Sequence, residues 1–354
     1  MAHGIRDRTI KDLDDITEGN DLPPLIFAAN KGPLSKEKKT KVQKAAIRKG
    51  APWSAPDVGD ADLQEGQVTE KAIAVMEKVK DKPFFLAVGF RKPHLSFDAP
   101  KKYYDLYRLE DMKLASNPYP PKDVFPRAMS DWGELRAYEG MPKHGPVSEQ
   151  QARELIRGYY AATSYTDTQV GRVLAALDRL GLRENTIIIL WGDHGWQLGE
   201  HGMWCKHTNF ETSTHAVLML SVPGQKNAGA KTEALTEFVD VYPTLVQLAG
   251  LPQPKGLEGI SFVPLIENPK QPWKTAAFSQ YPRGKLMGHA MRTDRYRFVE
   301  WAEKDKAPEG RELYDHQTDP DENVNIANQP ENKELVEKLS EQLRASWQKA
   351  MPSK

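Results

Sequence analysis

The chain has 354 residues, of which 39% are apolar and 28% are charged, a composition typical of globular proteins. Its 49 Lys and Arg residues equal its 49 Asp and Glu residues, and this zero net charge gives no support to nucleic-acid binding. No segment approaches the roughly 18 apolar residues of a membrane span. The single cysteine excludes a disulfide framework and a multi-cysteine metal site.

Residues 1 to about 66 lack the periodic patterns of helices and strands, and they are rich in Lys, Asp, Pro and Gly. A basic run extends from Lys31 to Gly50, and we interpret it as a solvated face because no phosphate-binding glycine loop accompanies it. The acidic run from Asp12 to Asp15 follows no strand that would orient it. We therefore interpret it as solvated and not as a metal pair.

Helical patterns then alternate with apolar strands. In the segment that begins at Thr69, apolar residues at helical spacing from Ala72 to Val79 predict a helix. The continuous apolar run Pro83 to Phe90 predicts a buried strand. A second helical pattern starts at a capping box formed by Ser148 and Gln151, and it ends at Gly181. Because this pattern is unusually long for a globular helix, we expect a break inside it.

Two further strands are predicted at Thr186 to Trp191 and Ala216 to Gly224, followed by a helix at Val239 to Gly250. Helices that alternate with short apolar strands predict an α/β fold in which helices flank a largely parallel sheet. After about Leu265 the pattern changes to half-exposed strands and a final charged helix, Asn332 to Gln348. We predict one domain over residues 1–265 and a small C-terminal α+β subdomain over residues 266–354.

Polar clusters follow two of these strands, "RKPH" after Phe90 and "GDHG" after Leu190. In open parallel sheets, ligands bind outside the carboxyl ends of the strands, so both clusters are candidates for a site. Flanking glycines permit a turn on which Asp193 and His194 converge. An Asp oxygen and a His nitrogen could then share a divalent cation, which makes this pair the candidate metal ligands.

Two more residues are candidates for contacts with an anion. Lys206 lies among aromatic and polar residues, where it would favour a bound phosphate, sulfate or carboxylate. His94 follows a proline that restrains the backbone, and it could donate a proton to a leaving group or hold an anion.

Three nearby residues receive structural interpretations. His201 in "GEHG" and His215 at the start of a strand are expected to support the fold and not to act chemically. Cys205 has neither a glycine elbow nor an arranged basic partner, so we do not interpret it as a nucleophile.

The motifs as a group resemble the sulfatase family, and within it the iduronate-2-sulfatase branch. The resemblance extends from about Pro83 to Ala327 and keeps the family order of its segments. It is carried by "FFLAVGFRKPHLSF", "YYAATSYTDTQVGRVLAALDRLGLRENTIII", "GDHGWQLGEHGMWCKHTNFE", "SQYPRG…MRTDRYRFVEW" and "ELYDHQTDPDENVNIA".

This resemblance implies an alkaline-phosphatase-like α/β fold, with residues 1–265 as the C-terminal portion of a catalytic domain. It implies hydrolysis of sulfate esters on a sulfated sugar or glycosaminoglycan, with a formylglycine nucleophile and one calcium ion. Asp193 and His194 match family metal ligands, Lys206 matches the sulfate-contacting lysine, and His94 matches the histidine that assists at the leaving oxygen. Calcium rests on the resemblance alone, because a histidine ligand by itself suggests a transition metal. Family members are usually exported, although the sequence itself does not fix a compartment.

The chain also departs from the family. It contains no C-x-P-x-R or S-x-P-x-R motif, the source of the formylglycine, and no Asp pair after a strand. We therefore expect a truncated chain that lacks its nucleophile and is inactive alone. The opening "MAH" resembles the end of a family G-K-x-x-H segment, which makes His3 a further anion-binding candidate.

Two alternatives stay open at this point. The first is a phosphate-ester hydrolase of the alkaline-phosphatase superfamily, whose members also place Asp-His at a strand end. The second is a non-catalytic relative that binds sulfated glycans, which would explain the missing nucleophile without truncation.

Overall fold

The computed structural model describes residues 25–28 and 50–352, which fall into two compact units. Unit 1 comprises the described residues within Met1–Lys113, Ala137–Met141 and Val147–Arg183. Unit 2 comprises the described residues within Leu114–Arg136, Pro142–Pro146 and Glu184–Lys354. The predicted domain boundary near residue 265 stays a prediction.

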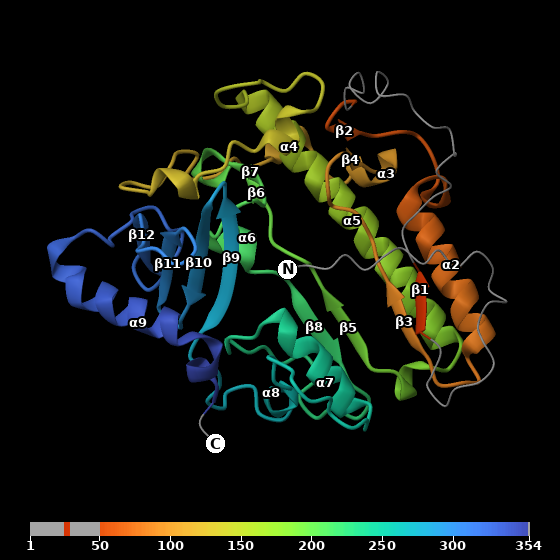
Figure 1. The fold of residues 1–354 in the computed structure, drawn as a ribbon. Coiled ribbons are helices and arrows are strands. Elements are labelled where there is room, and N and C mark those ends of the chain that lie inside the picture. The colour runs from red at the N-terminus through yellow and green to blue at the C-terminus, as the bar shows by residue number, and fades with distance from the viewer. Residues whose placement is uncertain (1–24, 29–49, 353–354) are drawn as a thin grey trace, which may run out of the picture. The chain divides into compact units, whose positions relative to one another are not determined.

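Unit 1 is built on two helices that lie side by side, α2 (Gln64–Val79) and α5 (Glu149–Arg179) (Figure 1). The buried hydroxyl of Tyr165 on α5 donates to the carbonyl of Asp60 at 2.7 Å and accepts from the backbone N–H of Gly66 at 2.9 Å, which fixes the two helices together. This unit also contains β1 (Leu25–Ala28), β2 (Trp53–Ser54), β3 (Phe85–Val88), β4 (Phe97–Asp98) and α3 (Lys101–Tyr104).

The strand pairs of unit 1 are parallel, as the sequence predicts: β1 pairs with β3, and β2 pairs with β4. Strand β3 lies inside the predicted run from Pro83 to Phe90. It is less buried than expected, because Phe85 is 43% exposed and its neighbours are half-buried.

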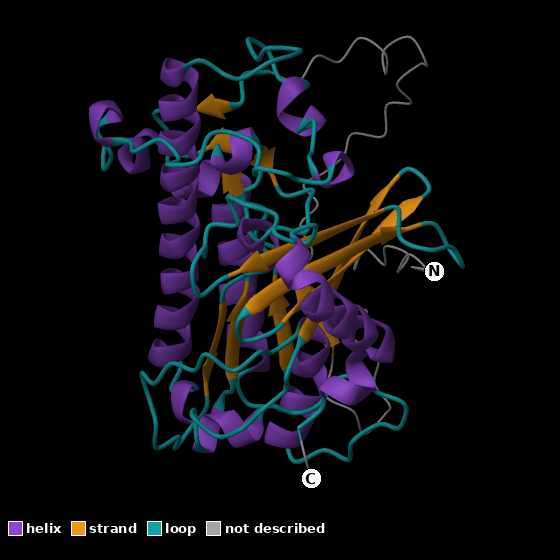
Figure 2. Ribbon diagram, turned by 90° about the vertical axis from the view of Figure 1, so that its left-hand side faces the viewer, coloured by secondary structure: helices purple, strands orange, loops and turns teal. Residues whose placement is uncertain are grey.

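Helix α5 confirms both predicted ends and corrects the predicted break. The Ser148 side chain accepts from the backbone N–H of Gln151, whose side chain accepts from the N–H of Ser148 in return. Gly181 adopts a φ of 70° beyond the C-terminus, which suits glycine. Between these ends α5 is one uninterrupted helix (Figure 2). Buried residues recur from Ala152 to Gln169 and again at Ala176 and Leu177, so tertiary packing supports most of the helix.

In unit 2, β5 (Ile188–Trp191) pairs with β8 (Leu218–Ser221), with Ile189 opposite Leu220. This pair is antiparallel, unlike the parallel arrangement expected for these strands. The connection between them holds only short elements: β6 (Gln197–Leu198), the 3-10 helix η5 (Glu200–Gly202), β7 (Trp204–Cys205) and α6 (Glu211–Thr214). It therefore lacks the long crossover helix that usually returns a chain to a parallel neighbour.

Apolar side chains of β5 and β8 pack against the predicted helix α7 (Val241–Leu248) and against α8 (Val263–Glu267). In the same unit, the ammonium group of Lys274 lies 2.8 Å from carboxylate oxygens of Glu237 and Asp240. Unit 2 also contains the short helix α4 (Gly133–Arg136).

The C-terminal α+β subdomain is present as predicted. Its four strands form an antiparallel sheet in the order β12-β11-β10-β9 (Figure 1): β9 (Ala277–Arg283), β10 (Leu286–Arg292), β11 (Tyr296–Ala302) and β12 (Gly310–Asp315). The predicted final helix is α9 (Lys333–Ala350), which is interrupted at Ser346. Leu339 of α9 packs with Phe298 and Leu313 of the sheet in one buried cluster. No helix among the described residues is long and apolar enough to cross a membrane.

The buried carboxyl group of Glu312 in this sheet predicts a pH-dependent stability. Its oxygens accept from Trp301 Nε1 and from the Tyr314 hydroxyl, both at 2.8 Å, and burial raises its pKa to about 7. The folded protein therefore retains a proton that the unfolded chain has released, so stability is lost as pH rises from about 4.5 to about 7. A pKa raised by about 2.5 corresponds to a loss on the order of 3 kcal/mol.

Glu312→Gln should remove this loss, because an amide keeps the size and hydrogen-bonding capacity of the protonated group. We expect the free energy of unfolding in urea, measured at pH 5 and pH 7.5, to fall more steeply in the unsubstituted protein than in the variant. The exposed Glu309→Gln is the control and should behave like the unsubstituted protein. Equal pH dependence in all three proteins would contradict the prediction.

Candidate active site

The turn that follows β5 is fixed by glycine. The backbone N–H of Gly195 donates to the carbonyl of Ser213 at 3.0 Å, and that of Gly192 donates to Val217 at the same distance. A Cβ on Gly195 would lie 2.1 Å from the carbonyl oxygen of Thr212, so no other residue fits there without displacing backbone. The two glycines therefore hold this turn against α6 and the residues that follow it, and they set the direction in which the side chains of Asp193 and His194 point.

Asp193 and His194 converge on this turn as predicted. His194 Nδ1 lies 2.8 Å from the carbonyl oxygen of Gly195, and because a carbonyl only accepts, Nδ1 carries the proton. The lone pair of Nε2 is then available, and Nε2 lies 3.4 Å from Asp193 Oδ2. The Asp193 side chain is 84% exposed. One nitrogen and one carboxylate oxygen thus face the same point, an arrangement that fits two ligands of a divalent cation.

The ring of Trp196 lies between Lys206 and His194 and contacts both side chains. His194 stacks on Trp196 with ring centroids 6.1 Å apart, and Lys206 Nζ lies 4.7 Å from the centroid of the same ring. The ammonium group also donates to Glu134 Oε2 at 2.7 Å, and both side chains are largely buried. The charge of Lys206 is therefore held in a defined position close to Asp193 and His194.

His207 extends the cluster toward the C-terminal sheet. Its ring packs on Tyr281 with centroids 5.8 Å apart, and Arg283 donates to its backbone carbonyl. Burial lowers the pKa of His207, and the positive charges of Lys206 and Arg283 lower it further, while Glu134 opposes the shift. A neutral His207 beside two permanent cations leaves a locally positive surface, which suits an anionic ligand.

His94 belongs to unit 1. Its Nδ1 lies 2.7 Å from the carbonyl oxygen of Leu95. Nearby, Lys92 donates to the carbonyl of Ser96 and lies 3.4 Å from Asp98, and burial is the main cause that lowers the pKa of Lys92. The grouping of His94 with the residues of unit 2 stays a prediction. His3, the acidic run from Asp12 and the basic run up to residue 49 lie outside the described residues.

Cys205 is only 1% exposed, which agrees with its interpretation as a residue without a catalytic role. Sequence patterns did not identify Glu134, Trp196, His207 and Arg283 as members of the cluster. Trp196 and His207 lie inside the stretch that drew attention to Asp193, so a signal for them existed. Glu134 and Arg283 are far from that stretch in sequence, and only the folded chain brings them to Lys206 and His207.

Glu134→Gln should strengthen the binding of inorganic sulfate to the chain. The substitution keeps a hydrogen-bonding partner for Lys206 but removes a negative charge 2.7 Å from its Nζ. For a partly screened pair we expect sulfate affinity to rise by about threefold to tenfold, measured by calorimetric titration. Asp131→Asn, an exposed substitution in the same segment, is the control and should leave the affinity unchanged. A weaker affinity in Glu134→Gln would show that Glu134 assists anion binding instead of opposing it.

Two family models together match most of the chain. A family model described as Sulfatase matches residues 34–251, and one described as N-sulphoglucosamine sulphohydrolase, C-terminal, matches residues 199–349. Iduronate 2-sulfatase of Mus musculus is 34% identical over 92% of this chain and 73% of its own length. Iduronate 2-sulfatase of Homo sapiens is 35% identical, and the match covers 71% of this chain but only 58% of the human protein.

Solved structures share the fold. Phosphonate monoester hydrolase of Agrobacterium radiobacter superposes with a TM-score of 0.70 at 24% identity, covering 86% of this chain and 65% of that chain. BT4656, solved in complex with its substrate D-glucosamine-2-N,6-O-disulfate, gives a TM-score of 0.66 at 22% identity, covering 80% of this chain and 70% of that chain. These similarities confirm the predicted alkaline-phosphatase-like α/β fold.

Proposed function

Because the chain belongs to the sulfatase family, we propose that it is the C-terminal part of a sulfuric ester hydrolase that acts on sulfated sugars. The observation that carries the proposal is the convergence of Asp193 Oδ2 and His194 Nε2 at 3.4 Å beside the cationic group of Lys206. A sulfate ester has a compact oxyanion that both a metal ion and an ammonium group stabilise.

Each residue of the cluster has a role in this proposal. Asp193 and His194 would hold the cation, with His194 fixed in the required tautomer by its bond to the Gly195 carbonyl. The cation is calcium by family resemblance, and when bound it would polarise the sulfate group. Lys206 would neutralise charge that develops on the sulfate oxygens, and its contact with Glu134 would orient it.

The proposed substrate is a sulfated sugar of the glycosaminoglycan type, supported by the identity to the two iduronate 2-sulfatases. Tyr281 offers an aromatic ring for a sugar, and Arg283, which lies over that ring, offers positive charge for an acidic sugar. In this proposal His94 assists at the leaving oxygen, and His3 binds the anion.

The nucleophile is the part of the mechanism that this chain does not provide. No C-x-P-x-R or S-x-P-x-R motif occurs in the sequence, and Cys205 is buried. We propose that the formylglycine and the remaining metal ligands belong to a preceding segment of a longer protein. The chain alone should then bind anions but not turn over sulfate esters.

Hydrolysis assays on two proteins test the proposal. The chain alone should release no 4-nitrophenol from 4-nitrophenyl sulfate, whereas a longer protein that joins a family N-terminal segment bearing the motif to this chain should do so. The longer protein should prefer the sulfate ester to 4-nitrophenyl phosphate. Preference for the phosphate ester would replace the sulfatase proposal by the phosphate-ester alternative. Failure of the longer protein to hydrolyse either ester, while it still binds sulfated glycans, would favour the non-catalytic alternative.

A further inference from the structure

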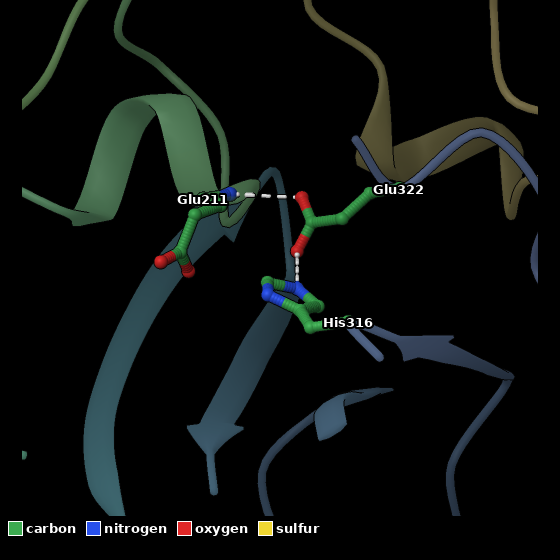
Figure 3. A group of neighbouring side chains, drawn as sticks. All are labelled: Glu211, His316 and Glu322. Carbon is green, nitrogen blue, oxygen red and sulfur yellow. Dashed lines mark hydrogen bonds and ion pairs between the residues drawn. The ribbon is translucent and has the colours of Figure 1, made fainter. Parts of the chain in front are cut away.

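The charged cluster drawn in Figure 3 is an ion network of unit 2. The carboxylate of Glu322 lies between the backbone N–H of Glu211 and the ring of His316, at 2.8 and 2.9 Å. Arg297 donates to both glutamates, so this group is neutralised by the protein itself and needs no bound cation. A second charged cluster surrounds Lys92 in unit 1, on the turn that carries a histidine of the proposed active site.

The side chain of Lys92 is buried although it carries a charge. It is 10% exposed, and burial is the main cause that lowers its pKa, while the carboxylates of Asp98 and Glu65 oppose the shift. Its ammonium group donates to the carbonyl of Ser96 and lies 3.4 Å from Asp98 Oδ2. Burying a charge costs free energy, so such a group is weak evidence for a gain in stability. It points instead to a role in fixing one local conformation.

Lys92 joins the two ends of the turn that carries His94. The backbone N–H of His94 donates to the carbonyl of Arg91 at 3.0 Å, which closes the turn before the histidine. The bond from Lys92 Nζ to the carbonyl of Ser96 closes it after the histidine, because these residues lie two positions before and two positions after His94. The backbone of His94 is therefore fixed from both sides.

Both ends of the turn are anchored to other elements of unit 1. The backbone N–H of Lys92 donates to Glu65 Oε1 on α2 at 3.3 Å, and its carbonyl accepts from the hydroxyl of Thr166 on α5 at the same distance. Asp98 on β4 accepts from the hydroxyl of Ser54 on β2 at 2.7 Å. The turn is thus positioned relative to two helices and a strand pair.

The same turn orients the ring of His94. Its Nδ1 lies 2.7 Å from the carbonyl oxygen of Leu95, and because a carbonyl only accepts, Nδ1 carries a proton. Any proton transfer to a leaving oxygen is then assigned to Nε2. The direction of Nε2 depends on the Leu95 carbonyl, which lies inside the segment that Lys92 closes.

We propose that Lys92 is a positioning residue for His94, because its ammonium group holds the turn in the conformation that directs the imidazole Nε2 toward the leaving oxygen. The proposal rests on the proposed function, in which His94 assists at that oxygen. Lys92 does not contact the reacting atoms. It acts through the carbonyl of Ser96, in the way that supporting hydrogen bonds fix a catalytic side chain.

Nitrogen NMR of the imidazole rings in the purified chain tests the geometry without turnover. At pH 8, above the usual titration range of histidine, His94 should show a protonated Nδ1 and an unprotonated Nε2, assigned by their loss in His94→Gln. In Lys92→Met the two signals should shift toward each other, because the ring then exchanges between tautomers. Lys92→Arg should restore part of the difference. Lys101→Met, which removes an exposed lysine paired with Asp105, is the control and should change nothing.

Kinetics of the longer protein test whether the effect reaches the reaction. Lys92→Met should lower kcat for an O-sulfated uronic-acid disaccharide by about tenfold or more, because a sugar alcohol leaves with the help of a proton. It should leave kcat for 4-nitrophenyl sulfate nearly unchanged, since 4-nitrophenolate leaves without one, and it should not change KM. His94→Gln should show the same dependence on the leaving group.

The two measurements separate this proposal from the proposed function. An unsubstituted longer protein that hydrolyses neither ester would contradict the proposed function, while the NMR signals still decide whether Lys92 fixes His94. Unchanged His94 signals in folded Lys92→Met, or equal losses of kcat for both esters, would overturn the positioning role. If Lys92→Met does not fold, Asp98→Asn replaces it. This variant keeps the side-chain shape, removes the charge 3.4 Å from Lys92 Nζ, and should shift the signals in the same direction.

Discussion

Arg297→Met is expected to lower the free energy of unfolding by about 3–5 kcal/mol, because it leaves two carboxylates without their buried counter-ion. The Arg297 side chain is 3% exposed and its guanidinium contacts both Glu211 and Glu322. Burial alone would raise the pKa of Glu211, yet His215, Arg297 and Arg292 outweigh it and hold that pKa well below its usual range. For a domain of about 150–250 residues, this loss corresponds to a fall in Tm of about 6–20 °C, measured by calorimetry.

Arg295→Met is the matched control. Arg295 lies two positions before Arg297 in the sequence and forms an ion pair with Asp315 at 2.6 Å. Its side chain, however, is 48% exposed. Surface pairs of this kind contribute about 0–1 kcal/mol, so the control should remain close to the unsubstituted protein. Adding Glu322→Gln to Arg297→Met should recover part of the lost stability, because it removes one of the uncompensated charges. A loss below about 1 kcal/mol in Arg297→Met would show that the network does not stabilise unit 2.

Lys206→Ala should lower kcat/KM for sulfate-ester hydrolysis by about 10²–10³-fold in the longer protein described above. The ammonium group is held between Glu134 and the ring of Trp196, so the substitution removes a positive charge whose position the fold defines. Lys206→Arg should retain part of the activity because it preserves the charge but changes its position.

Lys304→Ala, which removes an exposed lysine elsewhere, should leave kcat/KM unchanged. Thermal unfolding of each variant separates a catalytic effect from a loss of folding. If folded Lys206→Ala retained full activity, Lys206 would not contact the reacting sulfate group.

Local sequence patterns predicted the helix ends that are set by residues adjacent in the sequence. The capping box at Ser148 and the glycine at Gly181 define α5, and both ends appear where the pattern places them. The predicted break in α5 is wrong, since helix length alone says nothing about the packing that supports each turn. The pairing direction of β5 and β8 was also not predictable from apolar runs, because direction depends on how the connecting segment returns.

For the candidate site too, the sequence predicted the residues that are adjacent in the chain but not those that folding brings together. Asp193 and His194 were identified because their flanking glycines and the strand before them are adjacent in sequence, and the structure brings their ligand atoms to 3.4 Å. Glu134 could not be assigned to the site, because its contact with Lys206 joins segments 72 residues apart. His201 was interpreted as structural, and in the structure it is buried with its ring packed on Phe210.

The most direct test of the central claim is a calorimetric titration of the chain with an O-sulfated uronic-acid disaccharide in excess calcium. The proposed site predicts binding that requires the sulfate group and is lost in both Asp193→Asn and Lys206→Ala. Equal binding of the desulfated disaccharide, or undiminished binding in both variants, would contradict the assignment of these residues to a sulfate-ester site.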